Sequence, residues 1–319
     1  MRKAIGLLVS LALLALIWWQ VDVDAILAAT AQADPRWLAA GLLTIVPLTL
    51  VTAQRFRMLS RTPLSLGTAT RLILSASTLN LILPSKMGDI AKGVALTGRH
   101  GFGTKLAVAL VVMERSLDMA ALLFWGVLAL LWVGLDEPLY LLAALAVAAL
   151  FALLIVLLSP GRLAAQLIAL FGRLAPGKAG RWISGFADEW QAGTQWLWAE
   201  PARALRVVAV SLAIWGGHLL QFWLFAQALA PVPFLDNMAF ATLAILAGLL
   251  PFTMAGIGTR DAAILFLYRE FLSPGQAAVL GVLATLRYLL PAIAGLPFMG
   301  DYLDRSRKHD PAQNPKSRR

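Results

Sequence analysis

The sequence lacks the residues and motifs on which many catalytic and metal sites depend. It contains no cysteine, which excludes disulfide bonds, thiolate nucleophiles and cysteine metal ligands. Its three histidines, His100, His218 and His309, are too far apart in the chain to predict a metal cluster. There is no phosphate loop, no His-Glu-x-x-His motif and no Gly-x-Ser-x-Gly motif. We therefore predict no catalytic residue, no metal, no cofactor and no enzymatic activity.

Charged residues are also scarce, and apolar residues take their place. Charged side chains make up 14% of the 319 residues and hydrophobic ones 60%, against about 25% and about 45–50% in soluble domains. Several apolar runs approach the ~20 residues that a helix needs to cross a bilayer. The predicted fold class is all-α, a polytopic membrane protein with one transmembrane domain, residues 1–304, and a tail, residues 305–319. Six full spans are predicted, at residues 4–20, 37–53, 106–133, 138–158, 205–230 and 276–298.

The sign of the loop charges alternates along the chain. Lys and Arg gather before the first predicted span, after the second, between the fourth and fifth, and in the tail, whereas Asp and Glu follow the first, third and fifth. The basic residues after the second span are Arg55, Arg57 and Arg61. Basic loops stay in the cytoplasm. The pattern predicts a multi-pass protein of the bacterial cytoplasmic (inner) membrane with both termini cytoplasmic. Because these loops explain the net charge of +10, no nucleic-acid partner is expected.

Two apolar runs are interrupted by a similar short pattern. Leu83-Pro84-Ser85-Lys86-Met87 and Leu250-Pro251-Phe252-Thr253-Met254 each place Met three residues after the proline of a Leu-Pro pair. The apolar arms before these breaks, 72–84 and 238–251, reach only about 20 Å as helices, short of the ~30 Å bilayer core. We therefore predict two re-entrant helical hairpins, at about 72–97 and 238–271. The loop charges predict that they enter from opposite faces, as in an inverted repeat.

The segment 160–200 lies outside the predicted spans. Its aromatic residues Trp182, Phe186 and Trp190 recur near helical spacing, with charged residues between them. This pattern predicts an amphipathic helix on the cytoplasmic surface. The tail from residue 305 is basic and rich in polar residues, and we predict that it is disordered.

Charged side chains inside a membrane span have a high free energy in the bilayer, so each one in the predicted spans is expected to have a structural or functional role. Glu114 and Asp118 share one face of the third span, and Arg115 is within reach of Asp118. Arg287 lies inside the last span, where it is a candidate partner for Glu114 or for an anionic ligand. Two interpretations stay open: these residues pair with one another for structural reasons, or they line a polar cavity.

Polar residues also gather on the first predicted hairpin. Asp89 begins its second arm, where a carboxylate would cap the helix N-terminus. The same helix end can bind a phosphate, to which Lys86 and Lys92 would add positive charge. Asn80 lies on the first arm and would serve either the substrate or a hydrogen bond between helices.

The second predicted hairpin carries a comparable set. Gly256 and Gly258 would let backbone approach a ligand, although an ordinary tight turn also explains them, and Thr253 offers a hydroxyl. Arg260 and Asp261 are open to the same two interpretations as Asp89, helix capping or ligand binding. The complete set of candidate substrate-binding residues is Asn80, Lys86, Asp89, Lys92, Glu114, Arg115, Asp118, Thr253, Gly256, Gly258, Arg260, Asp261 and Arg287.

Taken in order, three motifs resemble a known family. They are Asn80…Leu83-Pro84-Ser85-Lys86-Met87-Gly88-Asp89, Glu114-Arg115-x-x-Asp118 and Pro251…Gly256-Ile257-Gly258-Thr259-Arg260-Asp261. The pattern is similar to that of the lysylphosphatidylglycerol synthase transmembrane-region family, whose members are described as flippase-like. The resemblance covers the chain from the first to the last predicted span and implies a membrane-embedded, lipid-handling protein. Lys86 and Lys92 stand where the family often has Arg, and Asp261 stands where it often has Glu.

The resemblance does not extend to catalysis. In the full synthases this region is joined to a soluble aminoacyl-transferase domain, and the 319 residues hold no soluble segment of that size. We therefore do not expect lysyl transfer.

The leading hypothesis is a flippase-like transporter that binds or moves an amphiphile with a charged headgroup. A phospholipid, an aminoacylated lipid or a polyprenyl-phosphate glycolipid would fit, so anionic or zwitterionic membrane lipids are the expected partners. The basic candidates would contact phosphate, and the acidic ones would balance them or contact a cationic headgroup. One alternative is a membrane-embedded enzyme that uses Glu114 and Asp118 as acid and base on lipid headgroups. Another is an accessory protein that binds an enzyme of lipid or envelope synthesis.

Overall fold

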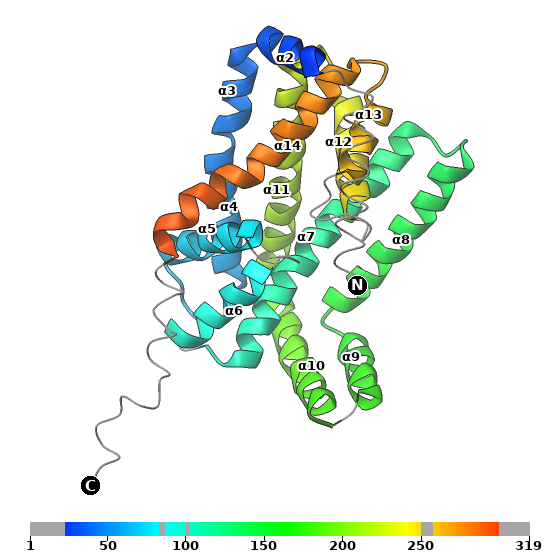
Figure 1. Cartoon of the computed structure of the whole chain (residues 1–319). Coiled ribbons are helices and arrows are strands. Elements are labelled where there is room, and N and C mark those ends of the chain that lie inside the picture. Colours follow the sequence, from blue (N-terminus) through cyan, green and yellow to red (C-terminus); the bar gives the residue numbers. More distant parts are fainter. Residues whose placement is uncertain (1–22, 83–86, 100–101, 176, 250–257, 300–319) are drawn as a thin grey trace.

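The regular structure of the described residues is helical throughout. The computed structural model describes residues 23–82, 87–99, 102–175, 177–249 and 258–299, and these contain no strand (Figure 1). Five helical stretches are long and apolar enough to cross a membrane. They are Pro35–Leu59, formed by α3 (Pro35–Leu43) and α4 (Ile45–Leu59), α7 (Thr104–Val133), α8 (Pro138–Leu158), α11 (Pro201–Gln227), and Pro274–Phe298, formed by α14 (Pro274–Gly295) and η2 (Leu296–Phe298). The all-α, multi-pass class is thus confirmed, whereas the predicted span 4–20 lies outside the described residues.

Helix α7 is the longest of the described helices. Its 30 residues correspond to a length of about 45 Å, more than the ~30 Å of a bilayer core. Lys105 lies in its first turn and Trp132 in its last. The indole N–H of Trp132 donates a hydrogen bond to Asp236, at the start of α12 (Phe234–Gly248), over 2.9 Å. Helix α12 therefore begins at the opposite end of α7 from Lys105.

Each of the two interruptions is flanked by a pair of packed helices. Helices α5 (Leu66–Ile82) and α6 (Met87–Arg99) flank the first, and α12 and α13 (Thr259–Leu267) flank the second (Figure 1). The helix ends at Ile82 and Met87 agree with the predicted first break. Helix α12 has 15 residues, about 22 Å, and is too short to cross the bilayer core. Membrane re-entry by these pairs stays a prediction.

Helices α5 and α6 cross at close range. A Cβ atom on Gly88 would lie 2.1 Å from the carbonyl oxygen of Ala76, so the crossing requires glycine. The N–H of Gly88 donates a hydrogen bond to Oδ1 of Asn80 over 2.8 Å. On its other side α5 packs along α14, where the hydroxyl of Thr78 donates to the carbonyl of Ala292 over 2.6 Å. These contacts anchor the first helix pair in the bundle.

The second predicted span, 37–53, is longer than predicted and is broken at Thr44. The Thr44 hydroxyl donates to the carbonyl of Gly41 over 2.6 Å, between the end of α3 and the start of α4. Helix α4 then continues to Leu59, well beyond the predicted end. As a result Arg55, which the charge pattern assigned to a cytoplasmic loop, lies inside the helix and is fully buried.

The predicted amphipathic segment 160–200 forms two helices, and the second contains Trp182, Phe186 and Trp190, on which the prediction of a helix rested. Helices α9 (Arg162–Leu174) and α10 (Gly177–Trp198) pack against each other as an antiparallel pair at one end of the bundle (Figure 1). Gly177, at the turn, has a φ of +58°, which residues with a side chain rarely adopt. The indole of Trp198 donates to the carbonyl of Leu158 over 2.8 Å, which ties α10 to the end of α8.

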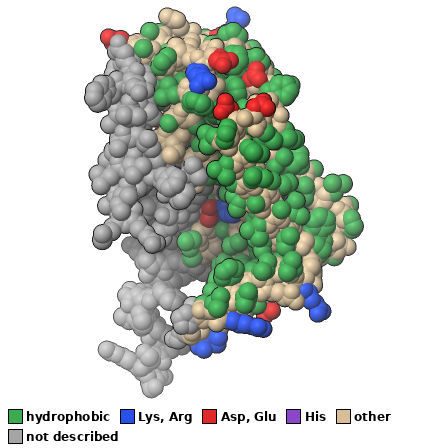
Figure 2. Space-filling model, turned by 90° about the vertical axis from the view of Figure 1, so that its right-hand side faces the viewer, with side chains coloured by type: hydrophobic (Ala, Val, Ile, Leu, Met, Phe, Trp, Pro, Cys, Tyr) green, Lys and Arg blue, Asp and Glu red, His purple; other side chains and the backbone are tan. Residues whose placement is uncertain are grey.

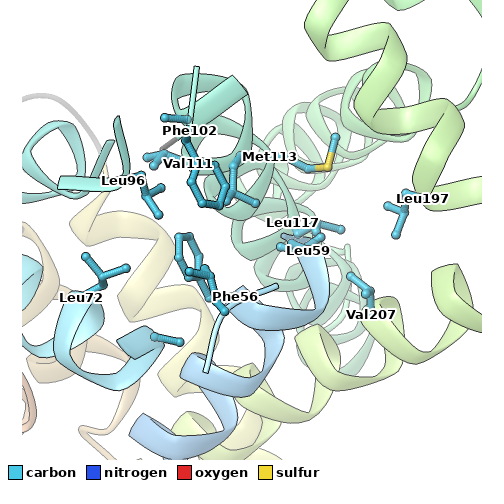
Figure 3. Packing of buried hydrophobic residues seen from close by; sticks show 14 of the residues in the cluster. Phe56, Leu59, Leu72, Leu96, Phe102, Val111, Met113, Leu117, Leu197 and Val207 are labelled. Carbon is cyan, nitrogen blue, oxygen red and sulfur yellow. The ribbon is translucent and has the colours of Figure 1, made fainter. Parts of the chain in front are cut away.

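Two groups of buried apolar side chains hold the bundle together. One includes Phe56 of α4 and Leu117 of α7 and extends to α6, α10 and α11 (Figure 3). The other includes Phe222 of α11 and joins it to α12, α13 and α14, while α2 (Val23–Gln32) packs against α14. Helix α8 lies at the edge, and its Leu142 and Leu145 are 66% and 62% exposed. Such exposure is expected of a helix whose surface faces lipid.

Candidate functional site

Charged side chains from three helices meet inside the bundle, where the first helix pair packs against α7 and α4. We call this group the ionic cluster. It consists of Arg55 from α4, Asp89 and Lys92 from α6, and Glu114, Arg115 and Asp118 from α7. Three members are cationic and three are anionic, so the cluster has no net charge when all are ionised.

The inner half of the ionic cluster, made of Arg55, Lys92 and Glu114, is inaccessible to solvent. Lys92 donates a hydrogen bond to Oε2 of Glu114, and both side chains are 0% exposed. Nη1 of Arg55 lies 2.6 Å from Oδ1 of Asp118, and its Nη2 lies 3.8 Å from Oε1 of Glu114. Ser211 of α11 accepts a further hydrogen bond from Arg55 over 3.3 Å. The four-residue spacing of Glu114 and Asp118 puts both carboxylates on the face of α7 that meets α4 and α6.

The outer half of the ionic cluster reaches the surface. Nε of Arg115 lies 3.7 Å from Oδ2 of Asp89, and its Nη1 lies 3.1 Å from Oδ2 of Asp118. The Arg115 side chain is 42% exposed and that of Asp89 is 13% exposed. A chain of alternating charges therefore leads from the buried Glu114 outward to one basic and one acidic side chain.

The outer half opens into a groove between α6 and α7. The groove has a volume of about 450 Å³, and Leu154 of α8 also lines it. In Figure 2 acidic and basic atoms lie together in a hollow among mostly hydrophobic side chains, and the other charged side chains of this face lie toward its top and bottom. Apart from Asp89 and Arg115 the wall is largely apolar; it is formed by Ile90, Gly93, Val94, Thr97, Thr104, Val108, Val111, Val112, Ser116, Met119 and Leu154.

Several buried polar atoms of the ionic cluster have hydrogen-bonding capacity left over. Nε and Nη2 of Arg55 and Oε1 of Glu114 make no hydrogen bond within the described part of the chain. Buried polar groups are normally satisfied by protein or by ordered water. Every charge in the cluster therefore has an opposite charge beside it, but some of its buried atoms lack a hydrogen-bond partner. Both earlier interpretations, structural pairing and a polar cavity, stay open for this cluster.

Three predicted residues of the second hairpin, Gly258, Arg260 and Asp261, make their contacts within the protein. Arg260 is buried, and its guanidinium lies 2.6 Å from Oδ1 of Asp261 and 2.9 Å from both the Gly281 carbonyl and the Thr285 hydroxyl of α14. Oδ2 of Asp261 accepts a hydrogen bond from the N–H of Gly258 over 3.2 Å, which caps α13. These contacts tie α13 to α14, and among the two interpretations they favour capping and pairing.

Arg287 lies apart from the ionic cluster. Its guanidinium lies over the rings of Phe222 (5.6 Å) and Tyr288 (4.6 Å), and its Nη2 donates to the Tyr288 hydroxyl. Glu114, the partner considered for it, is instead paired with Lys92. Asn80, as described above, bonds to the neighbouring helix of its own hairpin. Three further candidates, Lys86, Thr253 and Gly256, lie outside the described residues.

Comparison with models of known protein families gives one match to this chain. The sequence model described as "Lysylphosphatidylglycerol synthase TM region" matches residues 3–295. The chain belongs to the lysylphosphatidylglycerol synthase transmembrane-region family. No curated protein matches the chain.

Membership of the lysylphosphatidylglycerol synthase transmembrane-region family links this multi-pass membrane protein to the handling of lipid headgroups. The matched residues include both helix pairs, the ionic cluster and the groove. The name of the family refers to a transmembrane region and not to a catalytic domain.

Arg55 is the one member of the ionic cluster that the sequence analysis missed. It was counted with Arg57 as a loop charge, yet Arg57 is exposed and Arg55 is buried. A signal was present, because Ala53, Phe56 and Leu59 recur every three residues and all three are buried. This periodicity continues the helix past residue 53 and places Arg55 within it.

Proposed function

We propose that this chain is a flippase-like transporter that binds an amphiphile at the groove and moves its charged headgroup between the leaflets of the cytoplasmic membrane. The proposal rests on one observation, that an apolar surface and two charged side chains lie in the same groove. An apolar groove of about 450 Å³ has Asp89 and Arg115 in its wall. An amphiphile needs an apolar surface for its chain and polar partners for its headgroup, and the groove offers both.

The apolar wall of the groove would contact the acyl chain of the bound lipid. Ile90, Val94 and Val112 are exposed along the groove. An acyl chain lying against them stays out of water while the headgroup reaches inward. Leu154 on α8 also lines the groove.

The charges favour a headgroup that carries both signs. Arg115 would donate to a phosphate, and Asp89 would accept from an ammonium group. A headgroup with negative charge alone would gain from Arg115 but would be repelled by Asp89, whose Oδ2 lies only 3.7 Å from Nε of Arg115. Among the lipid classes considered, a zwitterionic headgroup therefore fits this pair best.

Lipid movement by the full-length protein in vesicles tests the proposal. Phosphatidylethanolamine and phosphatidylglycerol, each labelled with a reducible fluorophore on an acyl chain, report the fraction that reaches the outer leaflet when dithionite is added outside. The wild-type protein should move both faster than protein-free vesicles do, and phosphatidylethanolamine faster than phosphatidylglycerol. Arg115→Gln and Asp89→Asn should slow phosphatidylethanolamine at least about tenfold, since each removes a charge-assisted hydrogen bond.

Two exposed residues offer matched controls. Arg57→Gln and Asp136→Asn remove the same charges from positions away from the groove and should move lipid at the wild-type rate. Wild-type rates for Arg115→Gln and Asp89→Asn would refute the proposed site. Conversion of the labelled lipid into a new product would instead favour the enzyme hypothesis, which mass spectrometry of the same vesicles detects.

A further inference from the structure

We propose that Arg287 forms a second binding site, separate from the groove, which takes a single anionic group of the phosphate type. The site lies where α14 packs against α11. Free inorganic phosphate and the phosphodiester of a lipid share this chemistry. The inference does not depend on lipid transport, because it concerns binding at residues that are absent from the groove.

The guanidinium of Arg287 is buried without a counter-charge among the described residues. The residue is 5% exposed, and no described carboxylate lies within 4.0 Å of it. Arg55 and Arg260 are buried to a similar degree, yet each has a carboxylate oxygen at 2.6 Å. A buried charge that lacks a partner is costly, so the contrast calls for an anion beside Arg287.

Arg287 also has donors to spare. Its Nη2 is used by the Tyr288 hydroxyl, but Nε and Nη1 are buried and make no hydrogen bond within the described part of the chain. A guanidinium can donate five hydrogen bonds and accept none. Only an acceptor can satisfy these nitrogens, and the positive charge favours an acceptor that is negative.

The facing surface of α11 supplies further unsatisfied groups. Trp215, His218 and Phe222 are three and four residues apart and therefore share one face of the helix. Phe222 lies below Arg287, and the rings of Trp215 and His218 lie 5.7 Å apart. Nε1 of Trp215 and Nδ1 of His218 are both buried without a hydrogen bond in the described residues. The indole N–H of Trp215 is a donor only, so it too requires an acceptor.

This arrangement differs from that of the ionic cluster. There each cation lies beside a carboxylate and the sum of charges is zero, as the contacts of Arg55, Lys92 and Arg115 show. Within the described residues Arg287 contacts the rings of Phe222 and Tyr288 and the Tyr288 hydroxyl, with no carboxylate within 4.0 Å. The groove is therefore suited to a headgroup with both signs, and the Arg287 site is suited to an anion.

Thermal stability of the full-length protein tests the inference, because a ligand that binds only the folded state raises the melting temperature. The probes are inorganic phosphate with the protein in detergent, and phosphatidylglycerol against diacylglycerol in mixed micelles. We expect phosphate, phosphatidylglycerol or both to raise the melting temperature of the wild type, and the probe that acts identifies the source of the anion. Arg287→Gln should weaken this response at least about tenfold in ligand concentration.

Three further variants make the result decisive. Arg269→Gln removes an exposed arginine and should respond like the wild type. Arg115→Gln, which disables the groove, should keep the response, so that failure of the groove hypothesis and failure of this one are separable. If Arg287→Gln does not fold, Trp215→Phe removes one donor while keeping the ring and should weaken the response about three- to tenfold. No stabilisation of the wild type by either probe, or an unchanged response in Arg287→Gln or, where that variant does not fold, in Trp215→Phe, would overturn the inference.

Discussion

Lys92 on α6 and Glu114 on α7 form an ion pair that solvent does not reach on either side. Lys92 lies 4.7 Å from the centre of the Phe56 ring, so an aromatic face covers the ammonium group. The pair joins the first interrupted hairpin to the longest described helix of the bundle. Because both charges are desolvated, each depends on the other, and loss of one removes the nearest counter-charge of the other.

We expect Glu114→Gln to destabilise the protein by about 3–5 kcal/mol, the usual cost of breaking a buried pair. Thermal unfolding of the purified protein in detergent measures the change. Combining Glu114→Gln with Lys92→Met should recover part of the loss, because no buried ammonium is then left without its partner. The exposed Glu200→Gln serves as the control. A variant Glu114→Gln as stable as that control would contradict the role given to the pair.

We expect Arg55→Gln to destabilise the protein by about 3–5 kcal/mol and to reduce lipid movement. The change strips Asp118 of its nearest cation, at 2.6 Å, and removes a donor to Ser211. Arg57→Gln, two residues away on the exposed side of α4, should change stability by less than about 0.5 kcal/mol. If the two variants unfold at the same temperature, Arg55 is not the structural cation that the geometry indicates.

We expect Gly88→Ala to cost more than about 2 kcal/mol, because the new methyl group would lie 2.1 Å from the Ala76 carbonyl and force α5 and α6 apart. Gly67→Ala, in the partner helix α5, provides the matched control, since the nearest atom to its Cβ is 4.0 Å away. That substitution should be neutral or stabilise by up to about 1 kcal/mol, as replacing glycine in a helix does. Comparison of the two melting temperatures checks the close crossing.

The absence of native cysteine makes the topology directly measurable. Lys105→Cys and Leu235→Cys place single, exposed thiols at opposite ends of α7, the second beside the Trp132–Asp236 hydrogen bond. With intact cells we expect a membrane-impermeant maleimide to label Leu235→Cys, and Lys105→Cys only after the membrane is opened. Labelling of both from the outside would refute opposite entry of the two hairpins.

Much of the helical architecture could be predicted because bilayer-spanning helices are long and apolar, and because residues such as proline mark their ends. Helix α8 has the predicted bounds, 138–158, since Pro138 begins it and Ser159-Pro160 follows it. The turn between α9 and α10 was missed although the dipeptide Pro176-Gly177, which is typical of turns, marks it in the sequence. Helix α4 was cut short because Arg55 was read only as a topological charge.

The site could be predicted only in part, because partners from different helices leave no trace in local sequence. Glu114 and Asp118 were identified as a pair from their four-residue spacing, which a helix converts into one face. Their cations come from α4 and α6, and neither Arg55 nor Lys92 is at a sequence distance that indicates the contact. For the same reason Arg287 was a reasonable partner for Glu114 until the packing of α6 placed Lys92 there.

The equal number of cations and anions in the ionic cluster has an electrical consequence. A membrane potential acts on net charge and is worth about 2.3 kcal/mol per elementary charge at 100 mV. If the chain moves lipid as proposed, a headgroup bearing one phosphate and one ammonium carries no net charge across the bilayer, and the cluster beside it adds none. The cell's voltage then does no work on that transfer, whereas it would drive a lipid of unbalanced charge toward one side.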